Sequence, residues 1–235
     1  MFNYIHGIII KIGENMKDKW KLSIFSILVY AVYYLIPKLF NLIDYSRLSR
    51  TTIIALIFII DLIPLIFLLL IYYKDLKKEF KPFKENFLDS QDKYIRYYFI
   101  ALVLMTISNI LIEMFTGSTI SGNEEAIRSI GKVLPIYTII SCSFIAPISE
   151  ELVYRKTIKN IFINDKLSII FSGLIFGLAH VLGTYTGIID LLYIIPYGIF
   201  GAMFMYIYCD SKNIWNTIFI HFLHNTLLLI AYYIR

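Results

Sequence analysis

Long apolar stretches alternate with short polar segments along nearly the whole chain. A helix that crosses a hydrocarbon core about 30 Å thick needs roughly 20 residues, and several stretches reach this length. We expect seven spans, at residues 21–40, 51–73, 97–116, 133–160, 167–183, 189–208 and 214–234. Residues 4–10 are too short to span and indicate an interfacial segment or a fraying helix start. The pattern therefore predicts an all-α, polytopic membrane helix bundle of about seven or eight transmembrane helices.

The composition agrees with a membrane protein. Hydrophobic residues make up 58% of the 235 residues, and the mean hydropathy is +0.70, so the apolar share exceeds that of an ordinary soluble domain. The N-terminal residues lack the charged, apolar and small-residue order of a cleavable signal peptide. We therefore expect the first span to be retained as an anchor.

The basic residues indicate an orientation in the membrane rather than a nucleic-acid surface. The formal net charge is +5, but Lys and Arg near span ends mark the cytoplasmic side. Most of the 22 basic residues lie in the N-terminal segment, in residues 74–96, and around the fourth and sixth inter-span loops. We therefore expect a cytoplasmic N-terminus, an external C-terminus and no nucleic-acid partner. Residues 74–96 are predicted to form a solvated cytoplasmic loop that touches anionic lipid headgroups.

Ionisable side chains also occur inside the predicted spans. The segments are EELVYR at 150–155, FGLAH at 176–180 and HFLHN at 221–225. A charge at bilayer depth is costly, and it persists where it is paired or faces a cavity in which chemistry or transport takes place. Two carboxylates, an arginine, the two histidines His180 and His221, and an amide on three neighbouring spans therefore indicate an active site.

The turn between the fourth and fifth spans is centred near Asp165. Glu150 lies 15 residues before this turn and His180 lies 15 residues after it. Equal distance from the turn means equal depth in an antiparallel helix hairpin, because each residue adds the same rise. Glu150 and His180 are therefore predicted to face each other.

Residues four apart share one face of a helix. Glu151 and Arg155 have this spacing and are expected to form an ion pair. His221 and Asn225 share one face of the last span in the same way. His224 lies on a different face, so we expect it to matter less.

Each of these residues also has a purely structural interpretation. Glu151 and Arg155 can simply stabilise their helix, a single histidine is more often a packing residue, and an isolated Asn225 would join two helices. At matched depth the set as a whole favours catalysis. Four other polar residues rank behind it: Asp61, expected to pair with freed backbone donors or with a neighbouring span, and Ser141, Cys142 and Ser143, expected to lie at another depth.

The order of these motifs resembles that of a known family. Pro147 precedes E-E-x-x-x-R, and F-x-x-x-H and H-x-x-x-N follow. This order is similar to the CPBP (Abi) family of intramembrane proteases, which includes the type II CAAX prenyl endopeptidases and bacteriocin-immunity relatives. The resemblance covers residues from about 133 to 230. The family often has Gly after the arginine, where this chain has Lys156 and Thr157, so we expect local helix packing to differ.

The resemblance implies hydrolysis of a peptide bond within or beside the membrane. It implies that Glu150 and His180 activate a water molecule. It also implies that His221 and Asn225 donate hydrogen bonds to the oxyanion. Glu151 and Arg155 would then hold the helix that carries Glu150. On this basis we divide the chain into N-terminal transmembrane helices with the basic loop, residues 1–132, and a catalytic membrane core, residues 133–235.

Participation of a metal is a separate question. Glu150, His180 and His221 offer the two imidazoles and one carboxylate of a catalytic zinc site, and the family traditionally carries the label metalloprotease. The H-E-x-x-H motif, however, is absent from the sequence. We favour a metal-independent, glutamate-activated water, with zinc at these three residues as the alternative.

The expected partners are membrane lipid and a peptide or membrane-protein substrate, in a bacterial cytoplasmic membrane. A non-catalytic scaffold or bacteriocin-immunity protein of the same fold is the alternative function. A transporter is a third hypothesis, but the sequence shows no inverted repeat and no pair of broken helices. The sequence does not determine the oligomeric state.

Overall fold

The computed structural model describes residues 19–40, 48–162 and 164–234, with the side chains of residues 36–40 excepted. All regular structure in these residues is helical, and they contain no strand. Residues 4–10, where we expected an interfacial segment, lie outside the described residues. The helices are α2 (Lys19–Phe40), α3 (Arg50–Glu85), α4 (Phe87–Thr116), α5 (Gly122–Val133), α6 (Pro135–Ile140), η3 (Ser141–Ile145), α7 (Ala146–Glu151), η4 (Leu152–Thr157), α8 (Ile158–Ile161), α9 (Asp165–Leu182), η5 (Ile188–Tyr193), α10 (Ile194–Ser211) and α11 (Ile214–Ile234).

Six helical stretches among the described residues are long and apolar enough to cross a membrane. They cover Arg50–Glu85, Phe87–Thr116, Pro135–Ile161, Asp165–Leu182, Ile188–Ser211 and Ile214–Ile234, and each contains one of the predicted spans or matches it within two residues. The first predicted span corresponds to α2, a helix of 22 residues that is not among the six. The chain is therefore an all-α, multi-pass membrane protein.

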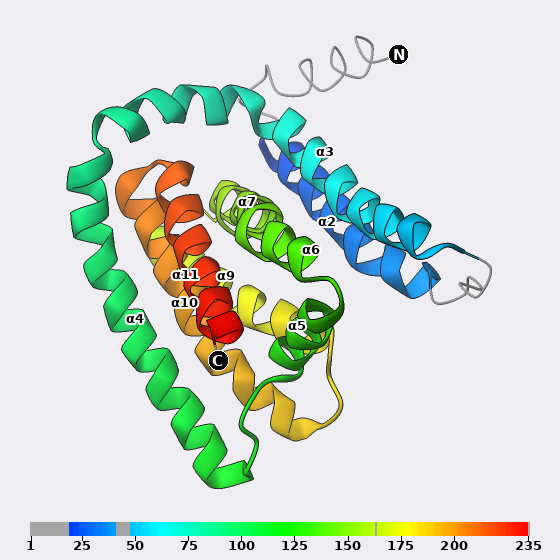
Figure 1. Cartoon of the computed structure of the whole chain (residues 1–235). Coiled ribbons are helices and arrows are strands. Elements are labelled where there is room, and N and C mark those ends of the chain that lie inside the picture. Colours follow the sequence, from blue (N-terminus) through cyan, green and yellow to red (C-terminus); the bar gives the residue numbers. More distant parts are fainter. Residues whose placement is uncertain (1–18, 41–47, 163, 235) are drawn as a thin grey trace.

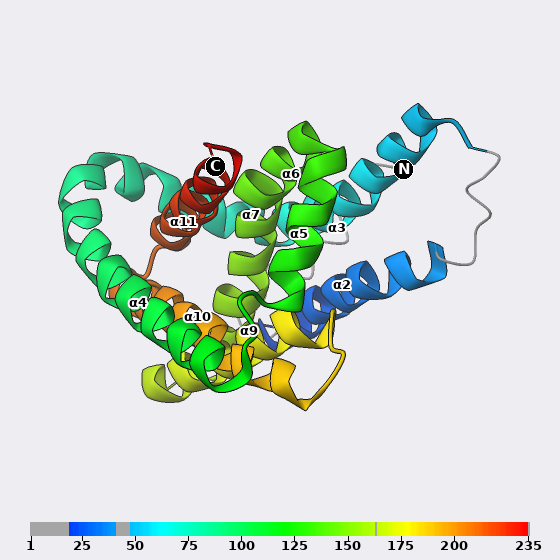
Figure 2. The same ribbon diagram turned by 60° about the horizontal axis from the view of Figure 1, so that its bottom comes forward.

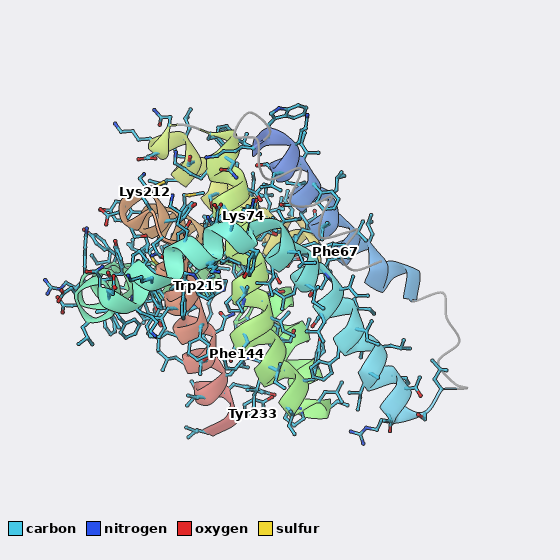
Figure 3. The ribbon with its side chains drawn as sticks, turned by 90° about the horizontal axis from the view of Figure 1, so that it is seen from above. Phe67, Lys74, Phe144, Lys212, Trp215 and Tyr233 are labelled. Atoms are coloured by element: carbon cyan, nitrogen blue, oxygen red, sulfur yellow. The ribbon has the colours of Figure 1, made fainter. Side chains whose placement is uncertain are left out.

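The prediction of a solvated loop at residues 74–96 is wrong. α3 continues through this segment to Glu85, and α4 begins at Phe87, so that Asn86 is the only break between them. Lys and Glu are good helix formers, and the segment has an apolar face that packs: Leu76 is buried, and its carbonyl accepts a hydrogen bond from Trp215 Nε1 at 2.9 Å. Figure 3, viewed from above, shows α3 crossing the bundle close to Trp215.

The helices form a central group with long helices on either side. α9, α10 and α11 lie between α4 on one side and the pair α2 and α3 on the other (Figure 1). Figure 2 shows that α5 stands beside α6, and that α2 and α3 diverge from each other toward their connecting segment. The fourth span thus lies between the central helices and the α2–α3 pair.

The fourth span is not a uniform α-helix. Two π-helical segments, η3 and η4, interrupt it and lie immediately before and after the α7 turn that ends in Glu150 and Glu151. A π-helical insertion shifts the side chains that follow it and releases backbone carbonyls from the α-helical pattern, and such insertions occur frequently at functional sites. Glu150 and Glu151 therefore lie in a short α-helical turn with a π-helical segment on each side.

Glycines allow α9 and α10 to approach each other closely. A Cβ added at Gly177 would lie 2.6 Å from the Ile194 carbonyl oxygen, and one added at Gly173 would lie 2.9 Å from the Gly198 carbonyl oxygen. Both distances are too short for a real side chain, so this crossing requires glycine. The close approach fixes the depth of α9, which carries His180.

Candidate active site

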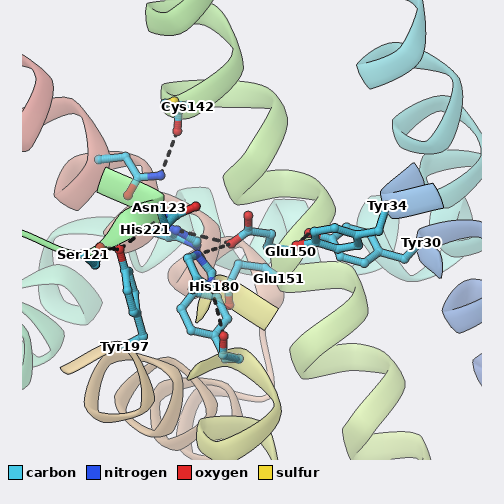
Figure 4. Close-up of polar contacts among 12 residues, drawn as sticks. Tyr30, Tyr34, Ser121, Asn123, Cys142, Glu150, Glu151, His180, Tyr197 and His221 are labelled. Atoms are coloured by element: carbon cyan, nitrogen blue, oxygen red, sulfur yellow. Dashed lines mark hydrogen bonds and ion pairs between the residues drawn. The ribbon is translucent and has the colours of Figure 1, made fainter. Parts of the chain in front are cut away.

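Glu150 and His180 meet across the helix hairpin, as their equal distances from the turn predicted. His180 Nε2 lies 3.8 Å from Glu150 Oε2, and both side chains are largely enclosed. Glu150 comes from the end of α7 and His180 from the last turn of α9. Figure 4 shows the His180 and His221 side chains beside the Glu150 carboxylate.

His221 of α11 approaches the same carboxylate oxygen. Its Nε2 lies 3.9 Å from Glu150 Oε2, while its Nδ1 lies 2.8 Å from Glu151 Oε1. The two adjacent glutamates therefore lie at the two different nitrogens of the His221 ring: Glu151 forms a hydrogen bond with Nδ1, and Glu150 faces Nε2 without a direct hydrogen bond. Sequence spacing did not predict the contact between Glu151 and His221.

The hydrogen bonds define the tautomers of both histidines. His180 Nδ1 lies 2.9 Å from the Phe176 carbonyl oxygen, which can only accept, so this nitrogen carries the proton. His221 Nδ1 donates to the Glu151 carboxylate, which is an acceptor while it is ionised. When either ring is neutral, its Nε2 is therefore an unprotonated acceptor that faces Glu150.

Three hydrogen-bond acceptors thus converge in one place. Glu150 Oε2 is buried and has no hydrogen-bond partner among the described residues. The distances of 3.8 and 3.9 Å are too long for direct hydrogen bonds, but one water molecule can bridge them. A water molecule can donate only two protons, so it cannot satisfy all three acceptors at once unless one of them is protonated or a cation is present. The site is therefore suited to polarising a water molecule.

A buried ion pair between Arg155 and Glu151 lies next to His221. Arg155 donates from Nε to Glu151 Oε2 at 2.9 Å and from Nη2 to Glu151 Oε1 at 3.1 Å, and both side chains are fully buried. Arg155 Nη1 also donates to Ser172 Oγ at 2.6 Å, and the guanidinium lies over the Phe176 ring at 4.7 Å. The ion pair predicted from the four-residue spacing is present, and it holds the carboxylate that orients His221.

Asn225 lies one turn after His221 and binds the fourth span. Its Nδ2 donates to the Cys142 carbonyl oxygen at 2.8 Å, and Cys142 belongs to the π-helical segment η3. One amide proton of Asn225 is therefore engaged, and the second is available to another acceptor. Asn225 and Cys142 both line the cavity that contains Glu150.

Among the residues that ranked behind the main set, Cys142 lines the cavity that contains Glu150, although we expected it at another depth. Asp61 pairs with a neighbouring span, since its Oδ2 accepts from Tyr137 at 2.7 Å and from Ser141 at 2.7 Å. Ser143 is buried, and its hydroxyl has no partner among the described residues. His224 lines the same cavity as His221, but its ring stacks on Phe200 with centroids 4.1 Å apart.

Sequence analysis missed several tyrosines that surround the site. The Tyr197 ring stacks on His180 with centroids 4.6 Å apart, and the Tyr197 hydroxyl lies 2.7 Å from Ser121 Oγ at the start of α5. Tyr30 and Tyr34 of α2 approach from the opposite wall (Figure 4). The chain contains 19 tyrosines, so their number alone could not single out these three.

A cavity of about 1350 Å³ surrounds these side chains. It extends from Glu150 and the histidines to α2 and α5, and apolar side chains form much of its wall. Small-molecule pockets usually measure about 300–1,000 Å³, so this space is large enough for several residues of a peptide. The arrangement can therefore bring an extended apolar chain to a polarised water.

The proposed zinc ligands have suitable chemistry but wide spacing. Tetrahedral zinc with bonds of about 2.0–2.2 Å holds neighbouring ligand atoms about 3.4 Å apart, whereas Glu150 Oε2 is 3.8 Å and 3.9 Å from the two Nε2 atoms. In the part of the chain that the structure describes, no three His, Cys, Asp or Glu residues are placed to hold a metal ion. We therefore derive no step through a metal.

Comparisons with known proteins show which family part of the chain resembles. Residues 132–227 match the family described as "Type II CAAX prenyl endopeptidase Rce1-like", and the matched region contains Glu150, His180, His221 and Asn225. The match covers less than half of the chain, and this part of the chain is similar to a family of membrane proteases.

Three bacterial proteins are similar to the chain over part or most of its length. The chain is 33% identical to the "Putative membrane peptidase YdiL" of Bacillus subtilis over 47% of this chain and 43% of the relative. It is 31% identical to the "Membrane-embedded CAAX protease MroQ" of Staphylococcus aureus over 52% of this chain and 49% of the relative. It is 29% identical to the "UPF0177 protein YaiH" of Lactococcus lactis over 92% of both chains. The matches thus span less than half the length of YdiL and MroQ. No solved structure matches the chain.

Proposed function

We propose that this protein is an intramembrane endopeptidase that cleaves a membrane-associated peptide or protein with a water molecule activated by Glu150 and His180. The observation that carries the proposal is the convergence of Glu150 Oε2 with two histidine Nε2 atoms at 3.8 and 3.9 Å. This convergence lies in a cavity large enough for a peptide and within the part of the chain that matches the protease family.

The reaction begins with a water molecule between Glu150 and His180. The Glu150 carboxylate accepts one proton while the water oxygen forms a bond to the scissile carbonyl carbon. The tetrahedral intermediate then breaks its carbon–nitrogen bond, and the protonated Glu150 delivers its proton to the leaving nitrogen. His180 Nε2 accepts the second proton of the former water and passes it to the amine. The products are one carboxylate and one ammonium group.

The oxyanion needs hydrogen-bond donors. The free amide proton of Asn225 is one. His221 donates from Nε2 when its ring is protonated, and the Glu151 carboxylate at 2.8 Å from Nδ1 stabilises that charge. Donors that are fixed before the reaction stabilise developing charge most effectively in an enclosed site. This role for His221 refines the initial expectation, because the neutral ring held by Glu151 is an acceptor on this side.

The proposed reaction takes place at a cell membrane. The N-terminus lies in the cytoplasm, the chain crosses the membrane seven times with α2 as the first span, and residues 133–235 supply the reacting groups. Lipid surrounds the protein. A non-catalytic scaffold or immunity protein of the same fold would not require Glu150, so substitution of this residue separates the two functions.

Glu150→Gln is the decisive variant because it keeps the size of the side chain and removes the base. Cells that carry the wild-type protein or this variant are compared by N-terminal proteomics of their membrane and secreted peptides. We expect cleaved termini that disappear with Glu150→Gln at equal protein abundance. The matched control is Glu125→Gln on the exposed side of α5, which should retain them. Unchanged termini in Glu150→Gln cells would refute the proposal.

A chelator separates the water mechanism from the zinc alternative. We expect purified protein to contain much less than one metal ion per chain by elemental analysis. We also expect it to retain activity in 1,10-phenanthroline, because Glu150 acts directly on water. One zinc ion per chain that is lost together with activity, and restored with it, would identify Glu150, His180 and His221 as ligands instead.

A further inference from the structure

The site contains more hydrogen-bond acceptors than donors. Glu150 is an acceptor, the Nε2 atoms of both histidines are acceptors while the rings are neutral, and one of the two amide protons of Asn225 is engaged with Cys142. A peptide carbonyl that becomes an oxyanion needs donors directed at it. Hydroxyl groups on the cavity wall outside residues 132–227 are candidates for such donors.

Two tyrosines of α2 meet this requirement. Tyr30 and Tyr34 are four residues apart, so they share one face of α2, and both line the cavity that contains Glu150 and the histidines. Figure 4 shows their side chains extending from α2 toward Glu150, on the side of the carboxylate away from the histidines.

Contacts with the protease core hold this face of α2 in place. Ser26 Oγ donates to the Tyr72 hydroxyl at 3.2 Å, and the Tyr72 hydroxyl lies 2.7 Å from Thr157 Oγ1. The Tyr30 ring packs edge-on against Tyr154 with centroids 5.4 Å apart. Tyr154 and Thr157 belong to the π-helical segment η4, which begins at Leu152, two residues after Glu150. These contacts therefore fix the position of the two tyrosines relative to the Glu150 carboxylate.

The proton count shows why a pair of hydroxyls is useful. The hydroxyl oxygens of Tyr30 and Tyr34 are 3.3 Å apart, so one hydroxyl donates to the other. The pair has two protons, and this bond uses one of them. The accepting hydroxyl keeps its own proton, and its oxygen becomes a better donor because it already accepts a hydrogen bond. No phenol oxygen of the pair needs to change its protonation state.

We propose that the Tyr30–Tyr34 pair of α2 donates a hydrogen bond to the scissile peptide carbonyl and stabilises the oxyanion formed there. This inference rests on the proposed peptidase function, and it adds a catalytic contribution from a helix outside residues 132–227. It assigns α2 a part in the chemistry in addition to its part in forming the membrane bundle.

The test uses purified full-length protein and an internally quenched fluorescent library of apolar decapeptides. The peptide that the wild-type protein cleaves fastest is resynthesised and used alone to measure kcat and KM. The variants are Tyr30→Phe, Tyr34→Phe, the double variant and Glu150→Gln. Tyr73→Phe on α3 is the matched control, since its side chain is 52% exposed and does not line the cavity. Thermal unfolding shows whether each variant remains folded.

We expect the double variant to lose about 10²–10³-fold in kcat, as removal of an oxyanion donor usually causes, with KM within about threefold of wild type and unfolding unchanged. Tyr73→Phe should match wild type. An unchanged kcat in the double variant would overturn the inference, and so would a rise in KM alone, which would indicate ground-state binding. Cleavage that persists in Glu150→Gln would instead overturn the proposed function itself.

Discussion

The Arg155 guanidinium is fully buried, and the Glu151 carboxylate balances its charge. Its guanidinium forms two hydrogen bonds with Glu151, and Glu151 in turn holds His221. We predict that Arg155→Met destabilises the protein by about 3–5 kcal/mol, because it leaves a buried carboxylate without its counter-charge. The measurement is the free energy of unfolding in detergent.

A double variant provides the control for this effect. Glu151→Leu together with Arg155→Met removes both charges, so it should be less destabilised than Arg155→Met alone, although it should be inactive because His221 loses its partner. Equal destabilisation of the single and double variants would mean that packing of Arg155 against Phe176, at 4.7 Å, matters more than the charge.

His221 and His224 differ in their contacts although both line the cavity. His221 bridges Glu151 and Glu150, whereas His224 stacks on Phe200 and its Nδ1 has no hydrogen-bond partner among the described residues. We predict that His221→Ala lowers kcat by about 10²–10⁴-fold, the range for loss of a proton-transferring group, and that His224→Ala has a smaller effect. Peptide cleavage at matched protein amounts measures both. The reverse order would place the reacting face of α11 at His224.

At the scale of the helices, one carboxylate joins α3 to two parts of the site. Glu79 Oε1 accepts from Lys156 Nζ at 2.6 Å, and Glu79 Oε2 accepts from the Ile214 backbone N–H at 2.7 Å. Lys156 follows Arg155, and Ile214 begins the helix that carries His221 and Asn225. This contact gives Lys156 a structural role at the position where the family often has Gly.

We predict that Glu79→Ala destabilises the protein by about 1.5–3 kcal/mol, the usual contribution of a hydrogen bond to a charged group. Lys156 retains Asp75 at 2.9 Å, so the loss should be partial. Thermal unfolding in detergent measures it. The control is Glu85→Ala, whose carboxylate is exposed and lies 3.7 Å from Lys81; equal effects of the two variants would contradict a specific link through Glu79.

At the scale of the whole molecule, the helix count sets the topology. If α2 and the six other apolar stretches all cross the membrane, the two ends of the chain lie on opposite sides. The lysines of the α3 extension favour the cytoplasm for the α3–α4 junction. We predict that a reporter inserted after Asn86 is cytoplasmic and that one fused after Arg235 is external.

Paired reporters make this measurement internally controlled. A phosphatase that is active outside the membrane and a fluorescent protein that folds in the cytoplasm are placed at the same two positions. Opposite results at the two positions are expected. The same side at both positions would mean that one of the five apolar stretches between Asn86 and Arg235 does not cross the membrane. An external reporter after Asn86 with a cytoplasmic one after Arg235 would mean that α2 lies along the membrane rather than across it.

Much of the helix pattern was predictable because hydropathy acts locally. A run of about 20 apolar residues is a span wherever it lies in the bundle, and the six apolar stretches follow these runs. The approach of Glu150 to His180 was also predictable, since a short turn fixes the relative depth of two adjacent helices. The segment 74–96 was predicted wrongly because charge density was taken as evidence for a loop, whereas its buried Leu76 face supports a helix.

The sequence by itself determined which spans exist, which polar residues they carry and which of these share a helical face. Only the tertiary structure decided the contacts between helices that are not neighbours in the chain. The bond from Glu151 to His221, the link from Glu79 to Ile214 and the approach of Tyr30 and Tyr34 to Glu150 all belong to this group. The physical reason is that rotation and sliding of one helix against another depend on side-chain packing along the whole interface. The glycines between α9 and α10 and the two π-helical segments set that packing here, and no local pattern specifies its outcome.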